Sequence, residues 1–405
     1  MPNELPLKDV RICDFMWVMA GPASTRILAD YGATVVRIES PTRVDTARTL
    51  QPFFGNQLGP DSSGLFANCN AGKLGISLDL GNPAARAVVH DLVRWADVVT
   101  ESFSPKAMRA WGYDYESLRT INPTVIMLSS CLMGQTGPLA KIAGFGNMAA
   151  AIAGFHNLAG WPDRAPAGVF GAYTDYVAPR FTAMAILAAL DHRRRTGEGQ
   201  YIDQSQAECA IHFLGPAILD YTVNGRVEGR VGNSDDAFAP HGVYPAAGDD
   251  QWVAIVCRDD DDWRRLCFAM ENQDLARDSR YASAAGRLEH RDAIDASIAA
   301  WSRAIERGAI ESRLQAHGVP AHQVQGSADA YTDPQFVHRG HFVALPHPGY
   351  GKFTVEGPRA KLSRTPATVR RTAPSLGQDN QHVLEDILGY DETRISELVA
   401  AGALG

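Results

Sequence analysis

The feature that most restricts the fold is the order of apolar and helical stretches near the start of the chain. VRICDF reads as a buried strand, GPASTRILADYG has apolar residues at near-helical spacing and ends at Gly32, and ATVVRIES is rich in β-branched residues. A strand, a helix and a second strand in succession favour a right-handed crossover between parallel strands. We therefore expect a parallel sheet.

The same alternation continues along the chain. Three further apolar runs read as strands: ISLDL, DVVTESF and TVIMLSS. The segments between them read as helices over 83–95 and 115–121, and YIDQS reads as a later strand. These elements predict an α/β fold with a Rossmann-like, doubly wound parallel sheet. In such a sheet, ligands bind at the carboxyl ends of the strands.

The composition predicts a globular chain with more than one domain. Of its 405 residues, 45% are hydrophobic and 21% are charged, which is ample for a sizeable core. After about residue 224, the stretch GRVEGRVGNSDDAFAP is rich in glycine and charge, as linkers are. The strand-like QWVAIVC and two helical stretches follow it. This is where we expect a second, smaller domain to begin.

Charge and cysteine usage narrow the possible partners and compartment. The net charge is -8 and the basic residues are scattered, which argues against a nucleic-acid partner. The six cysteines contain no C-x-x-C pair and read as reduced, buried thiols. MPNELPLKDV lacks the basic and then apolar segments of a signal peptide. The uncharged stretch 142–162 is too polar and contains too many glycines for a membrane-spanning helix. We expect a cytoplasmic protein with no membrane partner.

Several motifs for other chemistry lack the context that they require. GFGNMA, from Gly144, matches G-x-G-x-x-A, but GPLAKIA and no strand precedes it, which disfavours a nicotinamide or flavin site. The four acids at 259–262 are typical of a helix start. The three histidines between 338 and 347 lack an acidic partner at metal-site spacing, so we expect no metal. G-x-S-x-G is absent, which leaves a serine hydrolase of the nucleophile-elbow type without support.

Asp175 lies at the start of a long predicted helix. The helix covers about 176–195, with Pro179 in its first turn and three arginines followed by glycines at its end. Asp175 is therefore expected at or beside the N-cap. Asp is a favoured N-cap residue and needs no further function there. The local pattern alone leaves a structural and a catalytic role open.

Three collinear blocks carry a resemblance to a known family. They are CDFMWVMAGPASTRILADYGATVVRIES, DLGNPAARAVVHDLVRWADVVTESFSPKAM and TDYVAPRFTAMAILAALDHRRRTGEGQYIDQSQAE. Over residues 8–210 the chain resembles the class III CoA-transferases, which include formyl-CoA and carnitine-CoA transferases. RTAPSLGQDNQHVLEDILGY adds a weaker C-terminal match. The resemblance implies a large domain built from 1–224 and 326–405, with the linker and a small α+β domain at 225–325. It also implies an interlocked homodimer.

The resemblance also implies a site. The catalytic aspartate of the family falls on Asp175, which would attack an acyl-CoA thioester to form a mixed anhydride and then an aspartyl-CoA thioester. The implied contacts to coenzyme A fall by position on Val18, Met19, Ala20, Ser40, Leu78, Ser102, Phe103, Ala107, Arg109 and Lys141. Acyl-CoA and a carboxylic acid are then the substrates, without a metal, nicotinamide or flavin.

Two positions depart from the family pattern. A glutamine common after the first strand is Met19 here, which would make the acyl site less polar. A glycine common four residues after the aspartate is Pro179, which would change the helix start. The glycine-rich flap of formyl-CoA transferase has no clear counterpart. WVMAGP and ADYGATVVRIES look most like the branch acting on aromatic or bulky dicarboxylic acids such as benzylsuccinate, with succinyl-CoA as donor.

Two alternative functions stay open. Acyl-CoA racemases of the same superfamily exchange an α-proton with a histidine and an aspartate. The corresponding block here reads Gly144-Phe145-Gly146, and His156 comes ten residues or more too late. The other alternative is a non-catalytic subunit that works with a catalytic paralogue, against which the intact Asp175 argues. We predict a CoA-transferase.

Overall fold

A computed structural model describes residues 4–404 of the chain. They form two compact units. Among the described residues, the larger unit comprises 4–156, Gly168–Val227 and 335–404, and the smaller unit comprises Asn157–Ala167 and Glu228–Pro334. The short segment Asn157–Ala167 thus belongs to the smaller unit although the larger unit flanks it on both sides in sequence.

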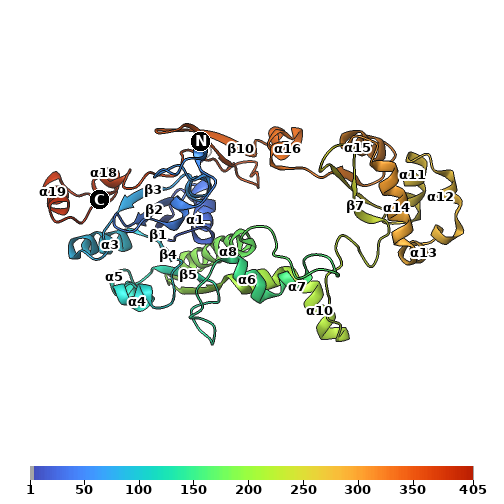
Figure 1. The fold of residues 1–405 in the computed structure, drawn as a ribbon. Helices are drawn as coiled ribbons and strands as arrows, with labels where there is room; N and C mark the ends of the chain where they lie inside the picture. Colours follow the sequence, from blue (N-terminus) through green and yellow to red (C-terminus); the bar gives the residue numbers. More distant parts are fainter. Residues whose placement is uncertain (1–3, 405) are drawn as a thin grey trace. The chain divides into compact units, whose positions relative to one another are not determined.

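A parallel sheet forms the centre of the larger unit (Figure 1). Its strands are β1 (Arg11–Phe15), β2 (Thr34–Glu39), β3 (Leu74–Ser77), β4 (Val98–Glu101), β5 (Ile126–Cys131) and β6 (Tyr201–Ser205). They lie in the order β3-β2-β1-β4-β5-β6, and every neighbouring pair is parallel. This order confirms the predicted α/β fold with a Rossmann-like sheet.

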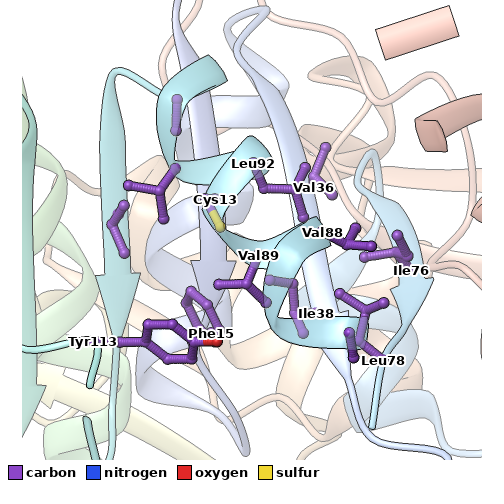
Figure 2. Close-up of a cluster of buried hydrophobic side chains, with 14 of the residues drawn as sticks. Cys13, Phe15, Val36, Ile38, Ile76, Leu78, Val88, Val89, Leu92 and Tyr113 are labelled. Carbon is purple, nitrogen blue, oxygen red and sulfur yellow. The ribbon is translucent and has the colours of Figure 1, made fainter. Parts of the chain in front are cut away.

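Helices cover both faces of this sheet, because side chains alternate along each strand. Cys13 and Phe15 of β1 face α3 (Pro83–Trp95), whose Val88, Val89 and Leu92 pack against β1 and β2 (Figure 2). Ile12 of β1 faces the other way, into a cluster with residues of α1 (Ala20–Asp30) and α8 (Tyr173–Thr196). Each fully buried aliphatic side chain contributes about 1.5–3 kcal/mol to folding.

Shorter elements complete the larger unit. The helices are α2 (Gly64–Asn70), α4 (Ala107–Trp111), α5 (Tyr115–Ile121), α6 (Gly146–Ala153), α9 (Gln206–Ile211), α10 (Gly215–Asn224), α18 (Asn380–His382) and α19 (Glu392–Ala400). The short helix α7 (Phe155–Leu158) crosses a boundary between the units, which falls after His156. The segment α17 (Pro334–His338) begins at the boundary between the units. An antiparallel hairpin pairs β10 (Phe342–His347) with β11 (Gly351–Glu356). Within residues 4–404, no helix combines the length and apolarity that a bilayer crossing requires.

The predicted start of the long helix is wrong. Helix α8 begins at Tyr173, with Ala172 at the N-cap and no side-chain capping bond, so no capping residue marks its start in the sequence. Asp175 is therefore the third helical residue, and Pro179 lies inside the helix beyond its first turn. Because proline has no N–H, the backbone carbonyl of Asp175 lacks the amide donor that normally follows four residues later.

The smaller unit has a separate core. Its antiparallel sheet consists of β7 (His241–Pro245), β8 (Trp252–Val256) and β9 (Ala321–Gln323). The helices are α11 (Asp260–Ala269), α12 (Gln273–Arg277), α13 (Ala284–Glu289), α14 (Arg291–Ser302), α15 (Arg307–Ala316) and α16 (Ser327–Thr332). Asp259 caps α11 by accepting a bond from the N–H of Asp262, 2.8 Å away. The four acids thus form a helix start, as predicted.

Candidate active site

A cleft of about 840 Å³ lies where β1, β2, β3 and β4 end. This is the edge at which doubly wound sheets bind ligands. The lining includes the strand ends Phe15 and Glu39 and the segment Ala143–Phe145. Among the predicted contacts to coenzyme A, those that line this cleft are Val18, Ser40, Leu78, Ser102, Phe103 and Ala107. The structure therefore brings together residues that are far apart in the sequence.

The other predicted contacts do not line the cleft. Met19 is the N-cap of α1 and is 8% exposed, and Ala20, the first residue of that helix, is buried. Arg109 borders a separate hollow of about 350 Å³, together with Glu101 and Tyr115. Lys141 is exposed, two residues before the lining residue Ala143. The side chain at position 19, where the family pattern has a glutamine, thus lies outside the lining of this cleft.

One wall of the cleft is aromatic. Trp17 and Phe103 meet edge to face with their ring centroids 5.7 Å apart, and Phe103 meets Trp111 in the same way at 5.2 Å. The backbone N–H of Trp17 donates to the Ser102 hydroxyl at 2.9 Å, and that hydroxyl donates to the Trp17 carbonyl at 3.3 Å. The end of β4 and the turn after β1 are thus tied together. This wall is apolar and suits the uncharged part of a long ligand.

Arg43 is the one cation among the described residues that line the cleft, and the sequence reasoning missed it. Ser40, Thr42 and Thr46, from the same loop after β2, also line it. Within residues 4–404 the guanidinium of Arg43 makes neither an ion pair nor a hydrogen bond, so it is free to meet an anion. The only signal in the sequence is its place just after a strand that ends at the ligand-binding edge.

Asp175 lies in the first turn of α8 and is 6% exposed. It adjoins Gly146, the first residue of α6, so closely that a Cβ atom on Gly146 would lie 2.8 Å from Asp175 Oδ1. The neighbouring Thr174 hydroxyl donates to the Gly146 carbonyl at 3.2 Å. Gly144 and Phe145 line the cleft, so a short segment connects the cleft to the carboxylate.

The carboxylate of Asp175 has no cationic partner among the described residues. Burial raises its pKa to about 6, and a backbone hydrogen bond from Gly146 opposes that rise only in part. A carboxylate that is buried without an ion pair is unfavourable for folding, and such groups are common in active sites. These properties make Asp175 the candidate reactive group of the site.

The larger unit thus combines a Rossmann-like sheet, a cleft at its ligand-binding edge, and a buried, unpaired carboxylate beside Gly146, the residue that follows the lining segment Ala143–Phe145. Residues 7–380 match the model of CoA-transferase family III. The chain belongs to this family, which confirms the resemblance found in the sequence. It is a CoA-transferase, and coenzyme A is part of its substrate. Among the described residues, no group of histidine, cysteine or acidic side chains could hold a metal ion.

Characterised relatives match the chain along almost its full length. A succinyl-CoA–D-citramalate CoA-transferase of Chloroflexus aurantiacus is 33% identical, with 98% of this chain and 97% of the relative covered. The alpha subunit of a succinyl-CoA–L-malate CoA-transferase from the same organism is 32% identical, with 98% and 92% covered. A crystal structure of a CaiB/BaiF family protein from Brucella suis is 30% identical, has a TM-score of 0.87, and covers 94% of this chain and 99% of its own.

Proposed function

We propose that the enzyme moves coenzyme A from succinyl-CoA to a second dicarboxylic acid through covalent intermediates on Asp175. The observation that carries the proposal is the buried carboxylate of Asp175, which has no cationic partner among the described residues and lies against Gly146, next in sequence to the lining residue Phe145. A nucleophile in this reaction must be ionised, shielded from water and unpaired, and Asp175 fits each requirement.

The proposed reaction conserves the energy of the thioester at each step. An oxygen of Asp175 attacks the acyl carbonyl of the donor, and the C–S bond breaks to give an anhydride and CoA thiolate. The thiolate attacks the side-chain carbonyl of Asp175 and releases the donor acid, which leaves an aspartyl-CoA thioester. The acceptor carboxylate attacks the carbonyl carbon of this thioester, and the C–S bond breaks to give a second anhydride and CoA thiolate. The thiolate then attacks the acceptor carbonyl, which releases the acceptor-CoA and restores Asp175.

The environment of Asp175 suits this chemistry. At neutral pH a carboxyl with a pKa of about 6 is mostly ionised, and it is a stronger base than an ordinary aspartate. Burial also limits the access of water, which would hydrolyse an anhydride. In this proposal the backbone N–H of Gly146 stabilises the oxyanion that forms on the Asp175 side chain, a contribution of roughly 3 kcal/mol for a well-placed donor.

The cleft is the proposed site of the coenzyme. Its aromatic wall would take the pantetheine arm, and Arg43 would meet a phosphate. The predicted contacts that line the cleft remain candidates for coenzyme A, whereas Met19, Ala20, Arg109 and Lys141 would have to act from outside its described lining. We expect the aspartate to react at the cleft end formed by Gly144 and Phe145.

The nature of the acids follows from the relatives and from the site. Succinate, citramalate and malate are all dicarboxylates, and the names of the two relatives pair succinyl-CoA with one of the others. We extend this to the present chain and keep benzylsuccinate-like, bulky acids as candidate acceptors. A panel of acceptors with succinyl-CoA tests the class: D-citramalate, L-malate, benzylsuccinate, formate and oxalate. Reaction with formate alone would overturn the dicarboxylate assignment, and reaction with oxalate as the only dicarboxylate would overturn its extension to the longer acids named for the relatives.

We also propose that the working enzyme is an interlocked homodimer in the cytoplasm. Helix α10 buries none of its residues within the described chain, and Leu219, Tyr221 and Val223 are 62%, 59% and 76% exposed. A second copy would cover this apolar face. The L-malate relative is one subunit of a larger enzyme, so a paralogous partner is the alternative. Sedimentation of the purified chain, followed by an assay without added partner, separates the two.

Chemical trapping tests the covalent step. The enzyme is mixed with succinyl-CoA and then with hydroxylamine, which would convert an aspartyl thioester to a hydroxamate, and the modified peptide is identified by mass spectrometry. We expect modification at Asp175 that is absent in Asp175→Asn and present in Asp191→Asn, which changes an exposed aspartate of the same helix. If no peptide is modified while CoA still binds, covalent transfer is wrong. Solvent deuterium at the α-carbon would then point to a racemase.

A further inference from the structure

We infer that Asp45 is a positioning residue that holds the turn after β1 in the shape that binds acyl-CoA. It does so by fixing Val18 in a left-handed backbone conformation. The inference rests on the proposed function in one respect, since it takes the cleft to be the acyl-CoA site. It adds a residue that does not line the cleft and that no motif in the sequence marks.

The backbone of Val18 is strained. Its φ is 69°, in the left-handed region that β-branched residues avoid because Cβ approaches the backbone. Val18 nevertheless lines the cleft between the aromatic wall at Trp17 and the start of α1. A conformation of this kind persists only where the surroundings impose it, and it commonly occurs at functional sites.

The carboxylate of Asp45 supplies the constraint. The N–H of Val18 donates to both of its oxygens, at 3.0 Å to Oδ1 and 3.1 Å to Oδ2. Asp45 is fully buried, and its Oδ1 also accepts the N–H of Ala47 at 2.9 Å. Arg37 donates to its Oδ2. The carboxylate thus joins the turn after β1 to the loop after β2, so that the two segments form one wall of the cleft.

The surrounding charges hold Asp45 in place. Its own N–H donates to Glu39 at 2.8 Å, and Glu39 also accepts from Arg37 and from Arg48, the latter at 2.8 and 3.0 Å. Arg48 in turn donates to Asp61 at 2.6 Å, and Asp61 is 24% exposed at the outer end of the chain of charges. Asp61 shares no hydrogen bond with Val18, whose N–H donates to Asp45, so Asp61 is a matched control for changes at Asp45.

The inference predicts a specific coupling between Asp45 and Val18. In Asp45→Asn an amide NH2 group replaces one of the two acceptor oxygens and faces Arg37. The hydrogen bonding of the Val18 N–H therefore weakens, and the backbone of Val18 leaves the left-handed conformation. In a Val18→Gly background the left-handed conformation is no longer strained. The loss caused by Asp45→Asn should therefore be smaller in that background by about tenfold, which corresponds to the usual penalty of a side chain in this region.

The test measures the dissociation constant of CoA by calorimetry and the turnover number in four proteins: wild type, Asp45→Asn, Val18→Gly and the double variant. We expect Asp45→Asn to weaken CoA binding by at least about tenfold with a much smaller change in turnover, and we expect the double variant to recover most of that loss. Asp61→Asn, the matched change at the far end of the same network, should stay within about twofold of wild type.

Two outcomes would overturn the inference. One is an equal effect of Asp45→Asn in both backgrounds, which would mean that Asp45 acts through the loop in general. The other is an effect no larger than that of Asp61→Asn. If Asp45→Asn does not fold, Asp45→Glu keeps the charge opposite Arg37 and takes its place. Ala107→Trp, which fills the cleft, checks the assumption separately: if it leaves CoA binding unchanged, the proposed CoA site is wrong rather than the role of Asp45.

Discussion

The buried carboxylates near the first two strands of the larger unit have cationic partners, whereas the buried carboxylate at the start of α8 has none among the described residues. Around the first two strands, Asp14 is paired with Lys73, and Glu39 and Asp45 are paired with Arg37. At the start of α8, Asp175 is almost equally buried but has no cation among the described residues to offset the loss of water. The arginines hold the pKa of Glu39 at about 2, whereas burial raises the pKa of Asp175 to about 6.

This difference distinguishes carboxylates that stabilise the fold from a carboxylate that is suited to react. A paired carboxylate stabilises the fold only while its partner is present, and it holds backbone groups in place. An unpaired one makes the folded state less stable and gains reactivity in return. The first group should therefore respond to substitution mainly in stability and binding, and Asp175 should respond mainly in turnover.

The largest expected effect is on catalysis at Asp175. Asp175→Asn should lower turnover by at least about 10⁴-fold, because the amide cannot attack a thioester. CoA binding should be retained, and the midpoint of thermal unfolding should stay the same or rise, since a buried unpaired charge is removed. Steady-state kinetics, calorimetry and thermal unfolding measure the three quantities. A loss of turnover below about tenfold would show that Asp175 is not the nucleophile.

The second effect is on stability at Glu39. Glu39→Gln breaks the buried contacts to Arg37 and Arg48 and should lower the free energy of unfolding by about 3–5 kcal/mol. Urea denaturation at neutral pH measures this change. The exposed pair Arg119–Glu116 supplies the control, because Glu116→Gln should change stability by less than about 1 kcal/mol. Equal effects of the two substitutions would show that the buried ion pairs of Glu39 stabilise the fold no more than an exposed pair does.

The third effect concerns the position of the nucleophile. In Gly146→Ala the new Cβ would lie 2.8 Å from Asp175 Oδ1 and 3.0 Å from Thr174 Oγ1, so the carboxylate must move. A displacement of this size should lower turnover by about 100-fold while the protein stays folded. Gly229→Ala is the control, because a Cβ atom there meets nothing within 4 Å. Turnover close to wild type in both variants would show that the close contact of Gly146 with Asp175 is not needed for the reaction.

The fourth effect is that the contributions of Asp175 and Glu39 to the free energy of unfolding change with pH in opposite directions. The pKa of Asp175 is raised from 3.8 to about 6, so between those values the folded state binds the extra proton and stability falls as the pH rises. The pKa of Glu39 is lowered from 4.5 to about 2, so its contribution grows with pH over that range and is complete above it. Between pH 4.5 and 6 the free energy of unfolding of the wild type should therefore decline by about 1.5 kcal/mol because of Asp175, and this decline should be absent in Asp175→Asn.

Denaturation at a series of pH values checks this difference between wild type and Asp175→Asn. The reaction should also depend on the ionisation of Asp175. We expect kcat/KM for the acyl-CoA to rise with pH and to level off above about pH 6. Parallel stability curves for the two proteins across this range would contradict the raised pKa.

The smallest expected effect is at Arg43. Arg43→Met should weaken CoA binding by about tenfold, through the loss of a charge-assisted contact to phosphate, and should make binding less sensitive to salt. Arg109→Met is the informative comparison, because Arg109 borders the separate hollow rather than the cleft. A larger loss in Arg109→Met than in Arg43→Met would restore the sequence-based choice of Arg109.

Much of this fold is predictable because its elements carry local signals. Helices α3 and α5 begin where predicted, since Asn82 and Asp114 cap them, and Pro83 occupies the first position of α3. The parallel sheet follows from the alternation of apolar strands and helices. By contrast, α8 begins after Ala172, which makes no side-chain capping bond, so its start was predicted three residues too late.

The site is only partly predictable. Asp175 could be singled out by resemblance to the family, but its burial and its contact with Gly146 depend on the packing of α6 against α8. The left-handed Val18 contradicts the preference of a β-branched residue, because Asp45, distant in sequence, imposes it. Arg43 lies in a loop without regular structure, and only the folded chain shows that this loop lines the cleft.

The most direct test of the account follows an oxygen atom from the acceptor acid to the enzyme. In the proposed reaction, one carboxylate oxygen of the acceptor remains on Asp175 when the acceptor-CoA leaves. The tryptic peptide 165–180 contains Asp175 as its only side-chain carboxyl, so mass spectrometry can localise a heavy oxygen isotope there. With heavy-oxygen-labelled acceptor and succinyl-CoA, we predict one labelled oxygen in this peptide after a single turnover and up to two after repeated turnover, because each cycle also removes one Asp175 oxygen with the donor acid. Turnover that leaves the peptide unlabelled would contradict covalent transfer through Asp175.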